Sequence, residues 1–211
     1  MSPYYEDDHV TIYHGDCREI DAWLTADVLV TDPPYGMSYE SNRTRSSSKI
    51  EGDDSTDVRD RALAAWGNRP ALVFGRWSIE RPTGVRMMLT WEKGDHTGMG
   101  DLSLPWKPTT EEVYVLGRGF SGEGRRSSVL RYMAPPPSRV HPTEKPLDLM
   151  LHLVSTCPPG VVADPFMGSG TTLRAAKDLG RNAIGVELSE RYCEIAAKRM
   201  AQEVLDFGGA A

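Results

Sequence analysis

Short apolar runs rich in β-branched residues alternate with helical patterns along most of this 211-residue chain. Each run spans four to seven residues and is bounded by Gly, Pro, Asp or Asn, as buried strands are. A repeating strand–helix order produces an α/β fold, with a mostly parallel sheet covered by helices on both faces. We therefore expect seven strands, at His9–His14, Asp27–Thr31, Ala71–Gly75, Val85–Trp91, Glu112–Leu116, Val161–Asp164 and Ala183–Glu187.

The segments between these runs carry helical spacing. Within one of them, Leu147, Leu151 and Val154 fall on the same side of a helix. The last two helical segments each open at a Ser or Thr in a cap position. The expected helices are Arg18–Leu24, Asp57–Trp66, Glu144–Thr156, Thr171–Leu179 and Glu190–Val204.

The length suits one well-cored domain over residues 1–211. No apolar run approaches the roughly 20 residues that cross a bilayer. The acidic start from Met1 to Asp8 is unlike a signal peptide, so we expect a cytoplasmic protein. The three cysteines, Cys17, Cys157 and Cys193, form no C-x-x-C pair, which argues against a disulfide framework and against a metal site.

Two long stretches, Gly36–Thr56 and Gly117–Val140, interrupt the strand–helix order. The first is polar and the second is rich in Gly and Pro, and long loops of this kind are either functional or disordered. The net charge of −6 is unlike that of a nucleic-acid binder, yet basic residues gather in both stretches. These residues are Arg43, Arg45 and Lys49 in the first stretch and Arg118, Arg125, Arg126 and Arg139 in the second. They form either a local basic patch or an ordinary solvated face.

The expected strand Asp27–Thr31 leads into the string Asp32-Pro33-Pro34-Tyr35. The two prolines remove two N–H donors, so the strand end offers carbonyl oxygens and the Asp32 carboxylate, all of which are acceptors. Such a cluster suits an exocyclic amino group. Accepting both of its hydrogens draws the nitrogen lone pair out of conjugation with the ring. Tyr35 offers a flat face for stacking. The simpler alternative is a strand exit in which Asp32 caps a turn.

A second string follows the expected strand Val161–Asp164 and reads Asp164-Pro165-Phe166-Met167-Gly168-Ser169-Gly170-Thr171-Thr172. Its two glycines allow a sharp turn and a close approach of ligand to backbone. The helix that begins at Thr171 presents unpaired N–H groups, which favour a carboxylate. Dinucleotide enzymes, phosphate binders and plain tight turns share this pattern, so these interpretations stay open.

The next expected strand ends in Glu187, 17 positions after Gly170. An acid in this place can accept both hydroxyls of a ribose, or it can interact with the dipole of the helix that begins at Glu190. The chain has no G-x-x-x-x-G-K-[ST] sequence, which argues against an NTPase. A nucleoside without a pyrophosphate fits better, and S-adenosyl-L-methionine is the candidate cofactor.

Together the two strings resemble those of the amino-group DNA methyltransferases, which make N6-methyladenine or N4-methylcytosine. Asp32–Tyr35 resembles the catalytic motif of that family, and Asp164–Gly170 resembles its S-adenosylmethionine motif. The catalytic motif comes first, as in the circularly permuted β group. The resemblance implies a Rossmann-like methyltransferase fold with seven strands, one of them antiparallel. It is strongest over Val10–Asp32 and His141–Met200.

The resemblance also implies roles for residues outside the two strings. The acid of His14-Gly15-Asp16-Cys17 would accept from the adenine amino group of the cofactor, unless Asp16 only caps the helix at Arg18. The string His141–Pro146 resembles the family segment H-P-T-x-K-P, in which Thr143 and Lys145 would contact the methionine end or the ribose, with helix capping and a surface charge as the alternatives.

Phe166 resembles an aromatic residue packed beside the methionine, for which an ordinary core phenylalanine is the alternative. The full set of implied cofactor residues is Asp16, Cys17, Asp32, Thr143, Lys145, Asp164, Pro165, Phe166, Gly168, Ser169, Gly170, Thr171, Thr172, Glu187 and Leu188. The implied catalytic residues are Asp32, Pro33, Pro34 and Tyr35.

The acid at position 32 favours adenine, because the cytosine enzymes of this family more often carry serine there. Methyl transfer to cytosine N4 stays open, as does transfer to RNA or to a protein amide. Amide-modifying relatives usually carry Asn at this position and the unpermuted order. A third interpretation is a DNA-binding relative without activity, against which the intact Asp32, Tyr35, Gly168 and Gly170 argue.

A duplex keeps the target amino group paired, so such an enzyme would extrude the base or act on an opened strand of DNA. The two irregular stretches are the expected DNA contacts, with their cations mostly gripping phosphates. Few irregular residues are available for sequence recognition, which leaves low specificity, a very short site or a homodimer that shares the work. The small size resembles phage or orphan enzymes, so a cognate restriction endonuclease and its absence are both open.

Overall fold

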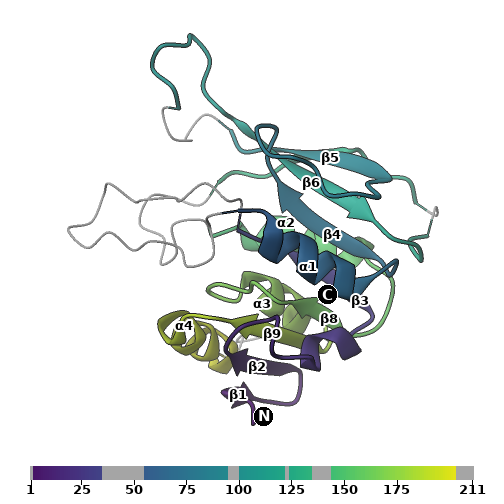
Figure 1. Cartoon of the computed structure of the whole chain (residues 1–211), viewed down its shortest axis with the longest axis vertical. Coiled ribbons are helices and arrows are strands. Elements are labelled where there is room, and N and C mark those ends of the chain that lie inside the picture. The colour runs from purple at the N-terminus through teal and green to yellow at the C-terminus, as the bar shows by residue number, and fades with distance from the viewer. Residues whose placement is uncertain (1, 35–54, 95–99, 122–123, 135–143, 203–211) are drawn as a thin grey trace, which may run out of the picture.

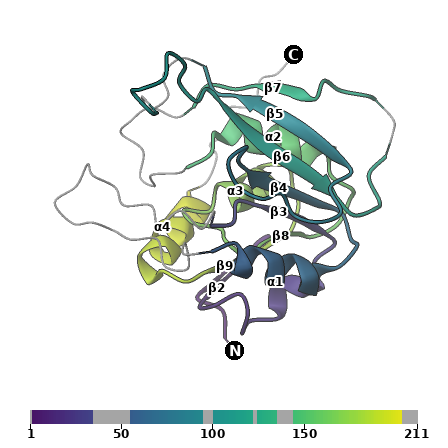
Figure 2. The ribbon, with the colours of Figure 1, turned by 45° about the horizontal axis from the view of Figure 1, so that its top comes forward.

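The computed structural model describes residues 2–34, 55–94, 100–121, 124–134 and 144–202, and the strands in these ranges form one nine-stranded sheet (Figure 1). Its order is β1-β2-β9-β8-β3-β4-β6-β5-β7, and Figure 2 shows this order from β7 at the top down to β2. The strands are β1 (Tyr5–Glu6), β2 (Val10–His14), β3 (Val28–Thr31), β4 (Ala71–Gly75), β5 (Met87–Glu92), β6 (Thr110–Leu116), β7 (Val129–Arg131), β8 (Val162–Asp164) and β9 (Ala183–Glu187).

The seven expected strands are all present, and six of them run in one direction. The strands from β2 through β9, β8 and β3 to β4 are parallel neighbours, whereas β6 is antiparallel to both β4 and β5. The expected mostly parallel, Rossmann-like sheet is therefore confirmed. Parallel pairing also places the carboxyl ends of these five strands along one edge of the sheet, which we call the site edge.

Two short strands were not expected, so the sheet has nine strands and not seven. β1 pairs antiparallel with β2 across a turn held by Asp7, whose Oδ1 accepts hydrogen bonds from the backbone N–H of His9 at 2.9 Å and of Val10 at 2.7 Å. β7 pairs with β5 and lies inside a stretch that we expected to be irregular. These strands have two and three residues, too few for an alternating pattern to show.

The helices are α1 (Asp57–Trp66), α2 (Leu147–Thr156), α3 (Thr171–Asp178) and α4 (Glu190–Ala201), with a 3₁₀ turn η1 at Ala22–Thr25. α1 has the expected bounds. α2 starts three residues later than expected, because Pro146 disfavours helical backbone at the residue before it. The end expected for α4, Val204, lies outside the described residues.

The helix expected at Arg18–Leu24 is wrong, and a turn followed by η1 stands in its place. Asp16 accounts for this difference. Its Oδ1 accepts the backbone N–H of Arg18 at 2.8 Å, and its carboxylate pairs with the Arg18 guanidinium. A side chain that takes up local backbone donors in this way competes with a continuous helix.

The helices cover both faces of the sheet. α2, α3 and α4 pack on one face, where Val28 and Val30 belong to the same buried cluster as Leu153 and Ala196. η1 and α1 pack on the other face, where Leu29 lies in a second buried cluster. This alternation along β3 is what a strand buried on both faces requires. In the ranges described above, no helix is both long and apolar enough to cross a membrane.

Candidate active site

At the site edge, the chain leaves β8 and β3 toward opposite faces of the sheet. The helix that follows β8 is α3, which packs on one face, whereas the helix that follows β3 is α1, which packs on the other. β8 and β3 are parallel neighbours, with Val28 opposite Val162. In open α/β sheets the crevice outside such a divergence is where ligands bind. The string that begins at Asp32 and the string that begins at Asp164 follow these two strands.

A hydrogen bond joins the two strand ends. The Thr31 hydroxyl donates to Asp164 Oδ1 at 2.7 Å, and the backbone N–H of Phe166 donates to the same oxygen at 3.1 Å. Both side chains are buried, and burial raises the pKa of Asp164 to about 6 against opposing hydrogen bonds from Thr172 and Thr31. Asp164 was expected among the cofactor residues, and the structure places its carboxylate inside the protein, between the two strands.

The glycine turn after β8 has the backbone that only glycine adopts readily. Gly168 and Gly170 have φ values of 52° and 79°, and a Cβ on Gly170 would lie 2.9 Å from the Cβ of Ala196. Gly170 is the N-cap of α3, and it has no side chain that could accept a hydrogen bond from the first turn of the helix. The first turn of α3 therefore presents amide donors that suit a carboxylate.

Glu187, at the end of β9, connects to this turn. Its Oε2 accepts the backbone N–H of Gly168 at 2.9 Å, and its Oε1 accepts the backbone N–H of Ser189, the residue before α4, at 2.9 Å. Burial raises the pKa of Glu187 against these hydrogen bonds. One carboxylate thus supports the turn and the start of α4 together, and a carboxylate has about four lone-pair sites, so it can accept further hydrogen bonds from ligand hydroxyls.

Asp16 lies beside Glu187 along the site edge. His14 is the register partner of Glu187, and the backbone N–H of Gly15 donates to the Glu187 carbonyl at 2.9 Å. Hydrogen bonds from Arg18 lower the pKa of Asp16. The Cys17 thiol is buried, which raises its pKa to about 12. The local role of Asp16 at Arg18 is therefore present, and the implied contact with a cofactor stays a prediction.

Asp32, on the other side of the two joined strands, contacts Lys145. The distance from Lys145 Nζ to Asp32 Oδ2 is 2.6 Å, and Lys145 is only 8 % exposed. We expected Lys145 to contact the cofactor, and the contact that the structure gives it is with the first residue of the catalytic string. Glu111 also approaches Lys145 and is paired with Lys93. Neither Glu111 nor Lys93 belongs to a motif, so neither could be picked out from the sequence.

Arg199 is a third residue that the sequence did not indicate. From the last turn of α4, its guanidinium donates to Thr171 Oγ1 at 2.7 Å and forms an ion pair with Glu144. It also approaches Ser169 Oγ at 3.5 Å. Arg199 therefore joins the glycine turn to the segment that carries Lys145.

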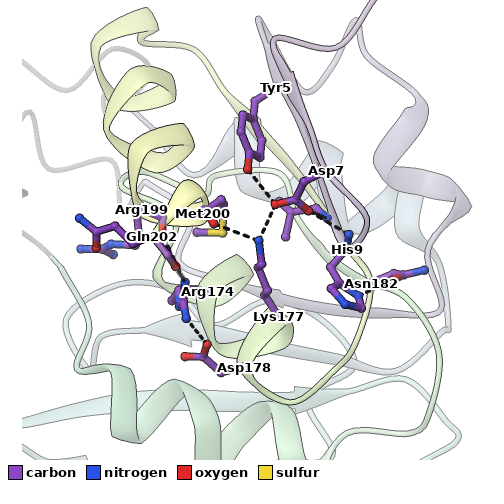
Figure 3. A network of polar contacts seen from close by, with 11 residues as sticks. Tyr5, Asp7, His9, Arg174, Lys177, Asp178, Asn182, Arg199, Met200 and Gln202 are labelled. Carbon is purple, nitrogen blue, oxygen red and sulfur yellow. Dashed lines mark hydrogen bonds and ion pairs between the residues drawn. The ribbon is translucent and has the colours of Figure 1, made fainter. Parts of the chain in front are cut away.

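The opposite end of α3 is held by a separate polar network, shown in Figure 3. Lys177 donates to Asp7 Oδ2 at 2.6 Å and to the Met200 carbonyl at 2.9 Å, while Tyr5 donates to the same Asp7 oxygen at 2.7 Å. Burial by itself would raise the pKa of Asp7, but the hydrogen bonds from Lys177 and the backbone lower it. This network fixes β1 and α4 against α3 away from the glycine turn.

Most of the remaining predicted residues fall into three groups. Pro33, Pro165 and Phe166 line one small crevice beside Thr31, and Phe166 packs against the second buried cluster. Arg118 follows β6, at the edge opposite Asp32, and Arg125 and Arg126 precede β7, so the structure does not bring these three to the site. Tyr35, Arg43, Arg45, Lys49, Arg139 and Thr143 lie outside the described residues.

An open α/β sheet with a glycine turn at its switch point places the protein in the Rossmann-like class of folds. Solved structures agree. The M1.HpyAVI–SAM complex has a TM-score of 0.66 at 24 % identity and covers 92 % of this chain and 100 % of that one. The PvuII DNA methyltransferase, described as cytosine-N4-specific, has a TM-score of 0.68 at 15 % identity and covers 97 % of this chain and 90 % of that one.

Sequence comparisons identify the family. The N6/N4 DNA methylase model matches residues 91–198. The type II methyltransferase M.ScaI of Streptomyces caespitosus is 38 % identical in an alignment that covers 95 % of this chain and 84 % of that protein. The chain belongs to the N6/N4 family of DNA methylases.

Proposed function

We propose that this protein is a β-group DNA methyltransferase that transfers a methyl group from S-adenosyl-L-methionine to the exocyclic N6 of adenine. The observation that carries the proposal is the hydrogen bond from Thr31 to Asp164. It fixes the acceptor that follows β3 next to the ligand turn that follows β8. A base held at the first and a methyl donor held at the second would lie side by side at the site edge.

The residues at the cofactor end, by which we mean Asp16, Asp164–Thr172 and Glu187, fit the proposed cofactor. Glu187 has lone pairs for the ribose hydroxyls, and the uncapped first turn of α3 has donors for the methionine carboxylate. Asp16, which follows the neighbouring strand β2, would accept from the adenine amino group. When bound, S-adenosylmethionine supplies an electrophilic methyl group on a positively charged sulfur.

The catalytic end, by which we mean Asp32–Tyr35 with Lys145, would hold the base. The Asp32 carboxylate and the carbonyl oxygens beside the prolines accept the two amino hydrogens, which leaves the nitrogen lone pair available for attack. No covalent bond to the enzyme is needed, since positioning and electrostatics suffice. Stacking of the base on Tyr35 is part of the proposal.

Adenine is proposed because position 32 is an acid, where resembling cytosine enzymes more often carry serine. Cytosine N4 is the second candidate, since the PvuII enzyme, which is described as cytosine-N4-specific, shares this fold. For either base the amino group must leave the duplex before it can reach Asp32. The stretch Gly36–Thr56, which follows the catalytic string directly, is the proposed DNA contact.

The test is transfer of tritiated methyl from S-adenosylmethionine to unmethylated DNA, followed by nucleoside analysis. Labelled N6-methyldeoxyadenosine is the expected product. Labelled N4-methylcytosine would replace the proposal with the second candidate. Label on RNA or on protein, with none on DNA, would overturn both.

A further inference from the structure

Lys145 Nζ is enclosed by two acids and two aromatic rings. It lies 2.6 Å from Asp32 Oδ2 and 3.2 Å from Glu111 Oε2. The centroids of the Phe74 and Trp91 rings lie 4.9 Å and 5.9 Å from it. Burial would lower the pKa of a lysine, but the two carboxylates raise the pKa of Lys145 to about 12. The lysine therefore stays charged at every pH at which an enzyme of this kind is assayed.

Glu111, from the start of β6, bridges two lysines. Its Oε1 pairs with Lys93 Nζ at 2.9 Å, and its Oε2 faces Lys145. Oε2 is buried, and among the described residues it has no hydrogen-bond partner of good geometry, so its contact with Lys145 at 3.2 Å is an ion pair without an aligned hydrogen bond. Burial would raise the pKa of Glu111, but the charges of Lys145 and Lys93 lower it.

The four groups form a row of alternating charge, from Asp32 through Lys145 and Glu111 to Lys93. Three of these groups come from strands: Asp32 follows β3, Glu111 lies next to the first residue of β6 and Lys93 follows β5. Lys145 therefore divides its charge between two carboxylates of which only Asp32 lies in the catalytic string. Among the described residues, Asp164 on β8 is a further charge that acts on Asp32.

We propose that Glu111 is a positioning residue: by sharing Lys145 with Asp32, it sets how strongly the lysine charge acts on the carboxylate that accepts the target amino group. A carboxylate fully engaged by a buried cation is a weak acceptor for a neutral N–H donor, and one without a cation is readily protonated. By sharing Lys145, Glu111 keeps Asp32 between these two states, neither fully engaged by the cation nor without one. The inference rests on the proposed function for the identity of the amino group.

Three variants test the row, because each removes one charge of known sign. Glu111→Gln removes a negative charge and leaves Lys145 to Asp32 alone, so the protonation midpoint of Asp32 falls. Lys145→Met removes the cation at 2.6 Å, so the midpoint rises by about one unit or more. Lys93→Met removes one of the two cations beside Glu111, so that Glu111 interacts with Lys145 alone. The protonation midpoint of Asp32 therefore rises, by less than in Lys145→Met.

Glu112→Gln is the matched control. Glu112 is the next residue on β6 and pairs with Arg81 at 2.8 Å and with the Tyr114 hydroxyl, on the opposite face of the strand from Glu111. The variant removes a comparable ion pair without touching Lys145. We expect it to leave the Asp32 midpoint and the rate of methyl transfer near those of the wild type.

The midpoint is measured by carboxyl ¹³C NMR titration of the full-length protein, with the Asp32 signal assigned through Asp32→Asn. In parallel, the pH profile of kcat is recorded for methyl transfer to DNA, and binding of S-adenosylmethionine is measured by calorimetry. We expect Glu111→Gln to lower kcat about tenfold, to move the acid limb of the profile to lower pH and to leave cofactor binding within about twofold.

Shifts of one common sign in all three variants, or an equal shift in Glu112→Gln, would overturn the proposal, since general structural damage gives no alternation of sign. A loss of kcat without movement of the acid limb would overturn it as well. The titration does not depend on the substrate. If the wild-type protein methylates no DNA but the midpoints alternate, the proposed function fails and the role of Glu111 in controlling Asp32 stands.

Discussion

The cofactor end and the catalytic end hold their carboxylates by different means. Glu187 and Asp164 are held by uncharged donors, namely backbone N–H groups and hydroxyls, and burial raises the pKa of both. Asp32 is held by a buried lysine that it shares with Glu111. Neutral donors fix the shape of a ligand site without adding charge, whereas a cation tunes how well a carboxylate accepts. On the proposed function, the first end would bind the cofactor and the second would activate the amino group.

The largest expected effect comes from Asp32→Ala. Removing the acceptor should lower methyl transfer by at least about a hundredfold, since preorganised groups of this kind contribute that much. Binding of S-adenosylmethionine, measured by calorimetry, should stay nearly unchanged, because Glu187 and the glycine turn are intact. Asp148→Ala, an exposed acid in the first turn of α2, is the control. Loss of cofactor binding in Asp32→Ala would abolish the distinction between the two ends.

Glu187→Ala should produce the converse result. We expect cofactor affinity to fall about ten- to hundredfold, equivalent to roughly 1.4–2.7 kcal/mol, from the loss of charge-assisted hydrogen bonds. At saturating cofactor, kcat should be largely retained. Glu190→Ala, which removes a neighbouring acid in the first turn of α4, serves as the control. A fall in kcat at saturation would show that the two ends are not separable.

The pH dependence of stability should test how Asp164 is held at the cofactor end. Its pKa of about 6 lies above the value of about 3.9 in an unfolded chain, so the folded state favours the neutral form. The stability contributed by this group is complete below pH ~4 and is lost as the pH rises through about 6. Relative to wild type, Asp164→Asn should therefore gain roughly 2–3 kcal/mol in free energy of unfolding between pH 4 and pH 7, measured by urea titration.

Asp7→Asn should show the opposite trend. Despite its burial, the pKa of Asp7 is lowered by its hydrogen bonds, so its contribution is present above the unfolded value and is lost as the pH falls. The variant should lose ground against wild type as the pH rises from about 2 to about 4, and its deficit in free energy of unfolding should be complete above that range. Parallel trends in the two variants would contradict the assignment of neutral donors to one carboxylate and a cation to the other.

The smallest expected effect is the difference between two glycine variants, about 1–2 kcal/mol, which reports the packing of the glycine turn. Gly170→Ala places a Cβ 2.9 Å from Ala196 at a φ of 79°, and we expect the free energy of unfolding to fall by about 2–3 kcal/mol. Gly180→Ala carries the same kind of φ, 66°, with nothing within 4 Å of the added carbon, and should cost about 1 kcal/mol. The difference, read from chemical denaturation, reports the contact between the turn and α4.

The cofactor end could be predicted from the sequence because its parts are contiguous. Strand, glycine turn and helix follow one another from Val162 to Asp178, and Glu187 ends the next strand. The spacing of these residues along the chain is therefore enough to predict how they are arranged. The seven principal strands were predictable for the same reason, since each is long enough to carry its own pattern, whereas β1 and β7 are not.

The catalytic end could be predicted only in part. Asp32 stood out through its prolines, but its partner Lys145 lies 113 positions away. Glu111 and Lys93 reach the row because β6 runs antiparallel to β4 and β5, so that its first residues return to the site edge. Strand order and direction decide this meeting, and no local pattern around Glu111 encodes either of them.

The hydroxyl of Thr31 has one more consequence. Because it joins the ends of two adjacent strands in the middle of a sheet, a displacement of either strand end is transmitted to the other. On the proposed function, the sites for the methyl donor and for the base would thus keep their spacing in the resting protein. Thr31→Val should therefore leave each ligand able to bind alone while loosening the alignment between them.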